Sequence, residues 1–267
     1  MSRVLRSYTQ LPGGQVHYRY AGDRHLPVLV LLHQTPSHSS MYLPLMQELA
    51  DQFYIIAPDT PGFGGSDPLS GECSIASFSE RLLEFLQALG VEVCTLFGHH
   101  TGASIAVQMA FDDPGRFNAL ALCGPTLLTD AQRETLPAKA AGFPAEADGS
   151  HLLKMWQRVR AKDEQAVLSL VQREVLSALV CGELYQASYR AVCAQDFATQ
   201  LAALGCPVLA FAGDQDLLIT AVEPSLALLS NGHTASLPTG AGTYACEQQA
   251  AEMAVILSDF VSTTTRT

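Results

Sequence analysis

Apolar residues along this chain gather in short continuous runs, and longer stretches of helical periodicity separate these runs. Continuous apolar runs are typical of strands that are buried on both faces of a sheet. Such runs occur at residues 27–34, 53–60, 92–98, 117–124 and 207–214. Further strands are expected at 14–22, where polar and apolar residues alternate, and at 233–240. Helices are expected at 40–50, 77–89, 102–112 and 251–261. This order predicts an α/β fold with a mostly parallel sheet and helices on both faces.

One segment, residues 127–195, interrupts the alternation because it contains no strand-like run. Two stretches within it place apolar side chains on one helical face: Leu152, Met155, Trp156 and Val159 in the first, and Leu168, Val171, Val175 and Leu179 in the second. We therefore expect a helical insert at 127–195 and a core domain made of 1–126 and 196–267. Open α/β sheets bind ligands at the carboxyl ends of their strands, so the insert is expected over those ends.

Composition narrows the class of protein. The 267 residues are 48% hydrophobic and 15% charged, which is enough apolar material for one large core. A net charge of −11 argues against a nucleic-acid-binding protein. No apolar stretch approaches the ~18 residues of a membrane span, and the first residues lack the apolar core of a secretory signal. We expect a cytoplasmic protein that contacts neither nucleic acid nor membrane.

The seven cysteines include no CxxC pair, and Cys94 and Cys123 fall in strand-like apolar runs. These two are expected to be buried thiols of a reducing compartment rather than halves of disulfides. Cys246, at the start of the last helix, is expected to have a packing role, although a helix N-terminus can lower the pKa of a thiol.

Four local patterns follow one another along the chain: LLHQTP at 31–36, PDTPGFGGSD at 58–67, GHHTGA at 98–103 and GDQDLL at 213–218. In order and spacing they resemble the α/β-hydrolase fold superfamily over nearly the whole chain. The resemblance implies a mostly parallel eight-stranded sheet with helices on both faces and a helical cap inserted after strand 6. It also implies a catalytic site at the carboxyl ends of the strands.

The resemblance places His100 where the superfamily carries the serine of its G-x-S-x-G nucleophile elbow. It places the acid of the catalytic triad at Asp216, but its histidine position holds Thr243, which we count among the oxyanion and substrate-binding candidates. The backbone N–H groups of Thr35 and Thr101 map onto the oxyanion hole, and Gln34 replaces a usual glycine. This departure from the triad argues against an acyl-serine mechanism.

His100 is the main candidate for chemistry, because the elbow presents its central side chain to the pocket. An imidazole can act as a general base, and a carboxylate at Asp216 could orient it. Such a pair could activate water or draw a proton from a carbon or hydroxyl acid. The side chains of Gln34, Thr35 and Ser37 could add hydrogen bonds to a developing oxyanion.

Other candidates have structural interpretations. His33 is expected to support its loop, His99 to point back into the fold, and His233 to lie at the surface by the far end of the sheet. The Thr101 side chain is expected to point away from the site. Although His33, His38, His99 and His100 lie near two strand ends, adjacent histidines rarely chelate one ion, so no metal is expected. No G-x-G-x-x-G or Walker pattern occurs, so no nucleotide cofactor is expected.

Three hypotheses for function follow. The first is an enzyme that hydrolyses, cleaves or isomerises a small carbonyl compound by acid/base chemistry with a non-serine centre. The alternative is a catalytically degenerate hydrolase-fold protein that binds or senses a small ligand, and the third is a structural partner protein. An enzyme should keep His100, Asp216 and the oxyanion donors convergent. The basic residues of 127–195 fit two interpretations: they attract a carboxylate-bearing substrate, or they form a solvated helix face. The sequence leaves open whether the protein forms a homodimer.

Overall fold

In the computed structural model, which describes residues 3–264, eight strands form one sheet in the order β1-β2-β4-β3-β5-β6-β7-β8. The strands are β1 (Leu5–Leu11), β2 (Gly14–Ala21), β3 (Val28–Leu32), β4 (Tyr54–Pro58), β5 (Cys94–His99), β6 (Phe117–Cys123), β7 (Val208–Phe211) and β8 (Gly232–His233). β2 pairs antiparallel with both β1 and β4, and every other pairing is parallel. The predicted α/β class with a mostly parallel eight-stranded sheet is confirmed.

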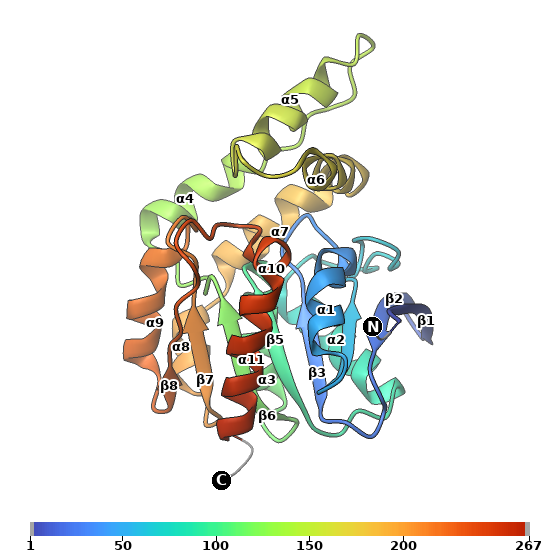
Figure 1. The fold of residues 1–267 in the computed structure, drawn as a ribbon. Coiled ribbons are helices and arrows are strands. Elements are labelled where there is room, and N and C mark those ends of the chain that lie inside the picture. The colour runs from blue at the N-terminus through green and yellow to red at the C-terminus, as the bar shows by residue number, and fades with distance from the viewer. Residues whose placement is uncertain (1–2, 265–267) are drawn as a thin grey trace.

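Helices cover both faces of this sheet (Figure 1). One face carries α1 (Leu43–Leu49), α10 (Ala245–Gln248) and α11 (Ala250–Thr264), and the other carries α2 (Ile75–Ala88), α3 (Thr101–Asp112) and α8 (Phe197–Ala202). Successive strand residues alternate between the two faces. Leu96 accordingly packs in the core under α2 and α3, whereas Phe97 packs in the core under α1 and α11. No helix in the described part of the chain has both the length and the hydrophobicity of a membrane span.

Two short 3-10 helices lie in the loops that follow β3 and β7. The short helix η1 (Ser39–Tyr42) leads into α1 from the loop after β3, and its Tyr42 hydroxyl donates a hydrogen bond to the Leu32 carbonyl at 2.8 Å. After β7, η2 (Ile219–Ala221) leads into α9 (Val222–Leu228). Both segments therefore start at the carboxyl ends of parallel strands, where open α/β sheets carry their sites.

The segment between β6 and α8 holds four helices: α4 (Asp130–Lys139), α5 (Ser150–Arg160), α6 (Leu168–Val180) and α7 (Glu183–Ala194). Figure 1 shows α4, α5 and α6 beyond the carboxyl ends of the strands. Met155, Val159, Val171 and Val175 are buried in a cluster of their own, as the periodicity predicts. Leu152 and Leu168, however, are 50% and 62% exposed, because α5 and α6 pack mainly on each other and leave their outer sides uncovered.

Two strands differ from expectation. β1 was not predicted, because its sequence LRSYTQL is mostly polar and its residues are largely exposed at the edge of the sheet. The strand expected at 233–240 is wrong beyond its first residue, since β8 ends at His233. β8 has a neighbour on one side only, and Pro238 has no backbone N–H to give to a ladder.

Candidate functional site

The turn between β5 and α3 fixes the position of His100. His100 has φ 49° and ψ −110°, and it is the only residue other than glycine with positive φ within 3–264. The residues two positions before and after it, Gly98 and Gly102, are glycines because the turn is packed tightly. A Cβ atom on Gly102 would lie 2.0 Å from the Leu32 carbonyl oxygen, and one on Gly98 would lie 2.4 Å from the Gly102 carbonyl oxygen. The start of α3 is therefore pressed against the end of β3, and a strained backbone presents the imidazole.

His100 and Asp216 form a close pair. The Nε2 atom of His100 lies 2.8 Å from Oδ2 and 3.0 Å from Oδ1 of Asp216, which follows β7 and is buried. Burial raises the pKa of Asp216, but the charge of His100 and its hydrogen bond outweigh burial and lower that pKa to about 2. An ionised carboxylate can only accept hydrogen bonds, so Nε2 must donate.

The other ring nitrogen of His100 is left available. In a neutral imidazole whose Nε2 carries the hydrogen, Nδ1 holds a lone pair and can accept a proton. Nδ1 makes no hydrogen bond with any residue of 3–264, and the His100 side chain is 16% exposed. Asp216 thus orients the ring, and the second ring nitrogen makes no hydrogen bond within the described residues.

Gly124, which sequence reasoning missed, makes room for the imidazole. It follows β6 with φ +65°, and a Cβ atom there would lie 2.3 Å from Cδ2 and 2.6 Å from Nε2 of His100. The backbone N–H of His100 also donates to the Cys123 carbonyl at 3.0 Å. The available signal was a glycine directly after the buried run FNALALC.

The predicted oxyanion donors lie on the loop after β3 and at the start of α3. Gln34 and Thr35 are buried, and the Gln34 Nε2 amide has no hydrogen-bond partner among the described residues. Within the same residues, no acceptor occupies the backbone N–H groups of Thr35 or Thr101. The two segments are adjacent, because the Cβ position of Gly102 is 3.0 Å from the His33 carbonyl oxygen.

The sixth predicted position, Thr243, lies two residues before α10 and is buried. Its loop packs on the loop of Asp216: the N–H of Gln215 donates to the Ala241 carbonyl at 2.9 Å. No hydrogen bond in 3–264 joins Thr243 to His100 or Asp216. Thr243 therefore lies on a loop beside that of Asp216, but it is not part of the His100–Asp216 pair.

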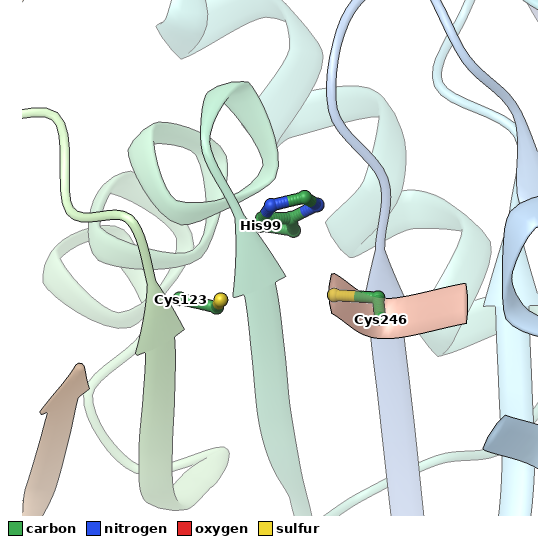
Figure 2. Close-up of side chains that lie close together, drawn as sticks. All are labelled: His99, Cys123 and Cys246. Atoms are coloured by element: carbon green, nitrogen blue, oxygen red, sulfur yellow. The ribbon is translucent and has the colours of Figure 1, made fainter. Parts of the chain in front are cut away.

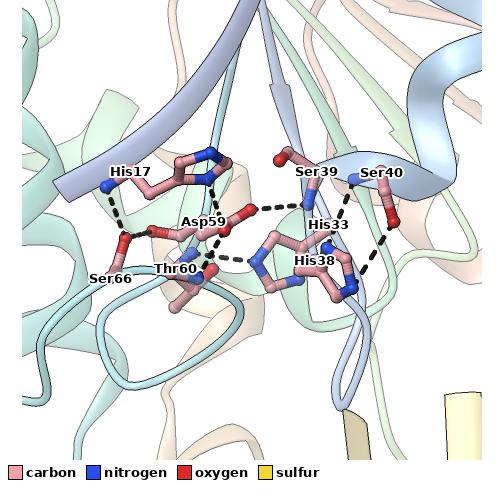
Figure 3. A network of polar contacts seen from close by, with 9 residues as sticks. His17, His33, His38, Ser39, Ser40, Asp59, Thr60 and Ser66 are labelled. Carbon is pink, nitrogen blue, oxygen red and sulfur yellow. Dashed lines mark hydrogen bonds and ion pairs between the residues drawn. The ribbon is translucent and has the colours of Figure 1, made fainter. Parts of the chain in front are cut away.

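A polar network beside the site explains the PDTPGFGGSD pattern (Figure 3). The Asp59 carboxylate accepts hydrogen bonds from His17 Nδ1 at 2.7 Å, the Ser39 N–H at 2.7 Å and the Gly65 N–H at 2.8 Å. Burial raises the pKa of Asp59, but these hydrogen bonds and the nearby His33 hold it well below its usual range. The network joins β2, the loop after β3 and the loop after β4, and His17 in it was missed from the sequence.

His33 has the supporting role expected of it. Its Nε2 accepts a hydrogen bond from the Thr60 N–H at 2.8 Å, so its Nδ1 carries the hydrogen and donates to the Gln34 carbonyl at 2.9 Å. Burial lowers the pKa of His33, which keeps the ring neutral for these two roles.

Glu174 of α6 is a buried acid that the sequence did not single out. Its Oε1 accepts hydrogen bonds from the Ser37 hydroxyl at 2.9 Å and from Arg173 Nη2 at 2.8 Å. Arg173 also forms an ion pair with Glu247 of α10, with 2.7 Å between Nη1 and Oε2. These contacts hold α6 on the loop after β3, next to Gln34 and Thr35.

The remaining arginines of the helical segment mostly bind backbone. Arg133, Arg158 and Arg160 donate to the carbonyls of Cys193, Ala141 and Ala166, respectively.

A cleft of about 420 Å³ lies between α6 and the loop after β4, lined by residues that include His38, Gly62, Gly64 and Arg173. Neither His100 nor Asp216 lines it, so this cleft is separate from the His100–Asp216 pair.

Comparison with known proteins shows the family to which the chain belongs. The family model described as the alpha/beta hydrolase fold matches residues 27–228, and the chain belongs to this family. "Putative carbamate hydrolase RutD" of Enterobacter cloacae is 27% identical over 233 residues, which cover 82% of this chain and 85% of that protein. The crystal structure of Cfl2 from Burkholderia cenocepacia is 25% identical with a TM-score of 0.80, covering 96% of this chain and 95% of that one.

Other matches are more local. An uncharacterized hydrolase of Saccharomyces cerevisiae is 32% identical over 124 residues, which cover 45% of this chain and 43% of that protein. The chain thus spans less than half the length of some curated relatives that it matches.

Gly124→Ala should disrupt the His100–Asp216 pair, because the added methyl group would occupy the space of the imidazole. We expect it to lower the free energy of unfolding by about 2–4 kcal/mol, combining left-handed backbone strain with overpacking. Gly90→Ala is the matched control, since Gly90 has φ +71° but nothing within 4 Å of its Cβ position. Denaturant unfolding of both variants separates the two effects, and equal losses would show that the imidazole yields without cost.

The His100–Asp216 pair should also make stability depend on pH in the acidic range. The folded pKa of Asp216, about 2, lies below its ordinary value of 3.8, so its contribution is present above about pH 4 and is lost as pH falls toward 2. The stability difference between the unmodified protein and Asp216→Asn should therefore shrink by on the order of 2 kcal/mol between pH 5 and pH 2. Urea unfolding measured across this range tests it, and a constant difference would contradict the pairing.

Proposed function

We propose that this chain is an enzyme that acts on a small carbonyl compound with His100 and Asp216 as its catalytic pair. Membership in the α/β hydrolase fold family supports the enzyme class. The observation that carries the proposal is the bidentate contact of His100 Nε2 with the buried Asp216 carboxylate, held at a strained turn. Strain of this kind persists where the surrounding structure enforces it, and it is concentrated at functional sites.

In the hydrolytic form of the mechanism, Nδ1 of His100 removes a proton from water as the water oxygen bonds to the carbonyl carbon. Asp216 orients the ring and stabilises the imidazolium that forms. The Thr35 and Thr101 N–H groups and the Gln34 amide donate to the oxyanion, each contributing on the order of 10²–10³ in rate. When the tetrahedral intermediate collapses, the imidazolium returns the proton to the leaving group as its bond to carbon breaks.

The substrate class is a small acyl compound that fits beneath residues 127–195, which we propose act as a cap. Carbamates are the first class to test, because a relative over most of the chain carries the name of a carbamate hydrolase. The same base could draw a proton from carbon or from a hydroxyl group. The panel therefore includes lactones and esters, diketones for carbon–carbon cleavage, and substrates for lyase chemistry.

His100→Ala and Asp216→Asn should each remove most of the turnover of whichever compound in this panel is converted, by at least about 100-fold. The double variant should lose little more than either single variant, because one group acts through the other. His233→Ala removes an exposed imidazole at the far end of the sheet and should keep full turnover. Steady-state kinetics and thermal shifts are measured together. Full activity in both single variants would place the chemistry elsewhere, and ligand binding without any turnover would support the sensor alternative.

Fluorophosphonate probes should not label the protein. Such probes require an activated serine, whereas position 100 is histidine and position 243, where the family carries its base, is threonine. Labelling should not exceed that of a heat-denatured sample, as measured by intact-protein mass spectrometry. Stoichiometric labelling of a serine would overturn the non-serine centre.

A further inference from the structure

Behind the turn that carries His100, three potential metal ligands meet in the core. His99 ends β5, Cys123 ends β6 and Cys246 lies in α10, and all three side chains are buried. One ligand atom from each residue lies within 4.8 Å of the others. Figure 2 shows the two sulfur atoms pointing toward each other from opposite sides of β5, with the His99 ring above them.

The His99 imidazole lacks the partners that a buried ring normally has. Neither Nδ1 nor Nε2 makes a hydrogen bond of ordinary length and angle to any described residue, although the side chain is fully buried, and the main favourable interaction of the ring is with the Cys246 thiol. Buried polar groups in folded proteins are almost always paired, and an unpaired one costs about 1–3 kcal/mol. His33 illustrates the usual case, because both of its ring nitrogens are occupied. The unpartnered ring next to two thiols is an arrangement that a bound ion would satisfy.

We propose that His99, Cys123 and Cys246 bind one Zn²⁺ ion. Two cysteines and one histidine are a zinc ligand set, with Zn–S distances near 2.3 Å and Zn–N distances near 2.0 Å. In tetrahedral geometry these bond lengths separate the ligand atoms by about 3.5–3.8 Å, so atoms within 4.8 Å of one another need to move by about 1 Å. Binding forms two Zn–S bonds and one Zn–N bond, and each cysteine thiol releases its proton to solvent.

The expected role of this ion is to clamp β5, β6 and α10 together beneath the turn. The His99 ring lies 4.4 Å from the His100 ring, centroid to centroid, so the clamp would support the residue proposed for catalysis. The site nevertheless uses ligands that the proposed mechanism does not. Zinc binding can therefore be tested with the metal alone, whether or not the proposed function is correct.

The test uses the full chain, stripped with a chelator and kept reduced. Cadmium, which favours the same thiolate ligands, should produce a thiolate-to-metal charge-transfer absorption that saturates at one equivalent and that Zn²⁺ displaces. Cys123→Ala and Cys246→Ala should each weaken binding at least 100-fold. Cys94→Ala is the matched control, because Cys94 is a buried thiol of β5 outside the cluster, and this variant should bind like the unmodified protein.

Two further measurements do not depend on whether the ligand variants Cys123→Ala and Cys246→Ala fold. X-ray absorption of the zinc-loaded unmodified protein should show two sulfur atoms and at least one imidazole nitrogen around the ion. Zinc should also raise the melting temperature of the unmodified protein and of Cys94→Ala in proportion to the logarithm of its concentration above Kd. An absence of stoichiometric binding, a shell of oxygen and nitrogen only, or an equal loss in Cys94→Ala would overturn the proposal.

Discussion

The left-handed backbone of His100 is the constraint on which the carboxyl edge of the sheet depends. L-residues adopt this conformation only at a cost, and three glycines allow it here: Gly102 lets α3 approach β3, Gly98 lets the first turn of α3 fold back onto the end of β5, and Gly124 leaves room for the ring. The same close approach sets the Thr101 N–H beside the loop that carries Gln34 and Thr35. One turn thus positions the His100 side chain and brings the first residues of α3 close to the loop after β3.

Three acidic side chains, Asp59, Glu174 and Asp216, are buried near the carboxyl ends of the strands in a chain whose net charge is −11. Asp59 is satisfied by an imidazole and two backbone N–H groups, Glu174 by a hydroxyl and a guanidinium, and Asp216 by His100 and the Leu218 N–H. Buried charges are tolerated only with such partners. Asp59 and Glu174 use theirs to fix loops and helices, whereas Asp216 contacts a ring that still has an unoccupied nitrogen.

Structural features that depend on a short stretch of sequence could be predicted. Continuous apolar runs located the buried strands, and the patterns around residues 34, 100 and 216 placed these residues at one edge of the sheet. Contacts between distant segments were not predictable: Glu174 meets Ser37 across 137 residues, and Gly124 matters only because His100 folds over it. β1 was missed because an edge strand needs little hydrophobicity. Cys123 and Cys246 were interpreted as separate packing residues because periodicity does not reveal which core side chains meet.

The hydrogen bond between Ser37 and Glu174 has a consequence for exchanging parts between related proteins. The helical segment is contiguous in the chain, which suggests that it could be transplanted as a unit. Glu174 is buried, however, and its contacts reach outside the segment. It accepts a hydrogen bond from Ser37, and its neighbour Arg173 forms an ion pair with Glu247. The protein that receives the segment would have to supply both Ser37 and Glu247. A transplant without these two residues would leave the Glu174 carboxylate without its hydroxyl donor and the Arg173 guanidinium without one of its two acids. The unit that can be exchanged therefore consists of the helical segment together with two residues that lie far from it in the sequence.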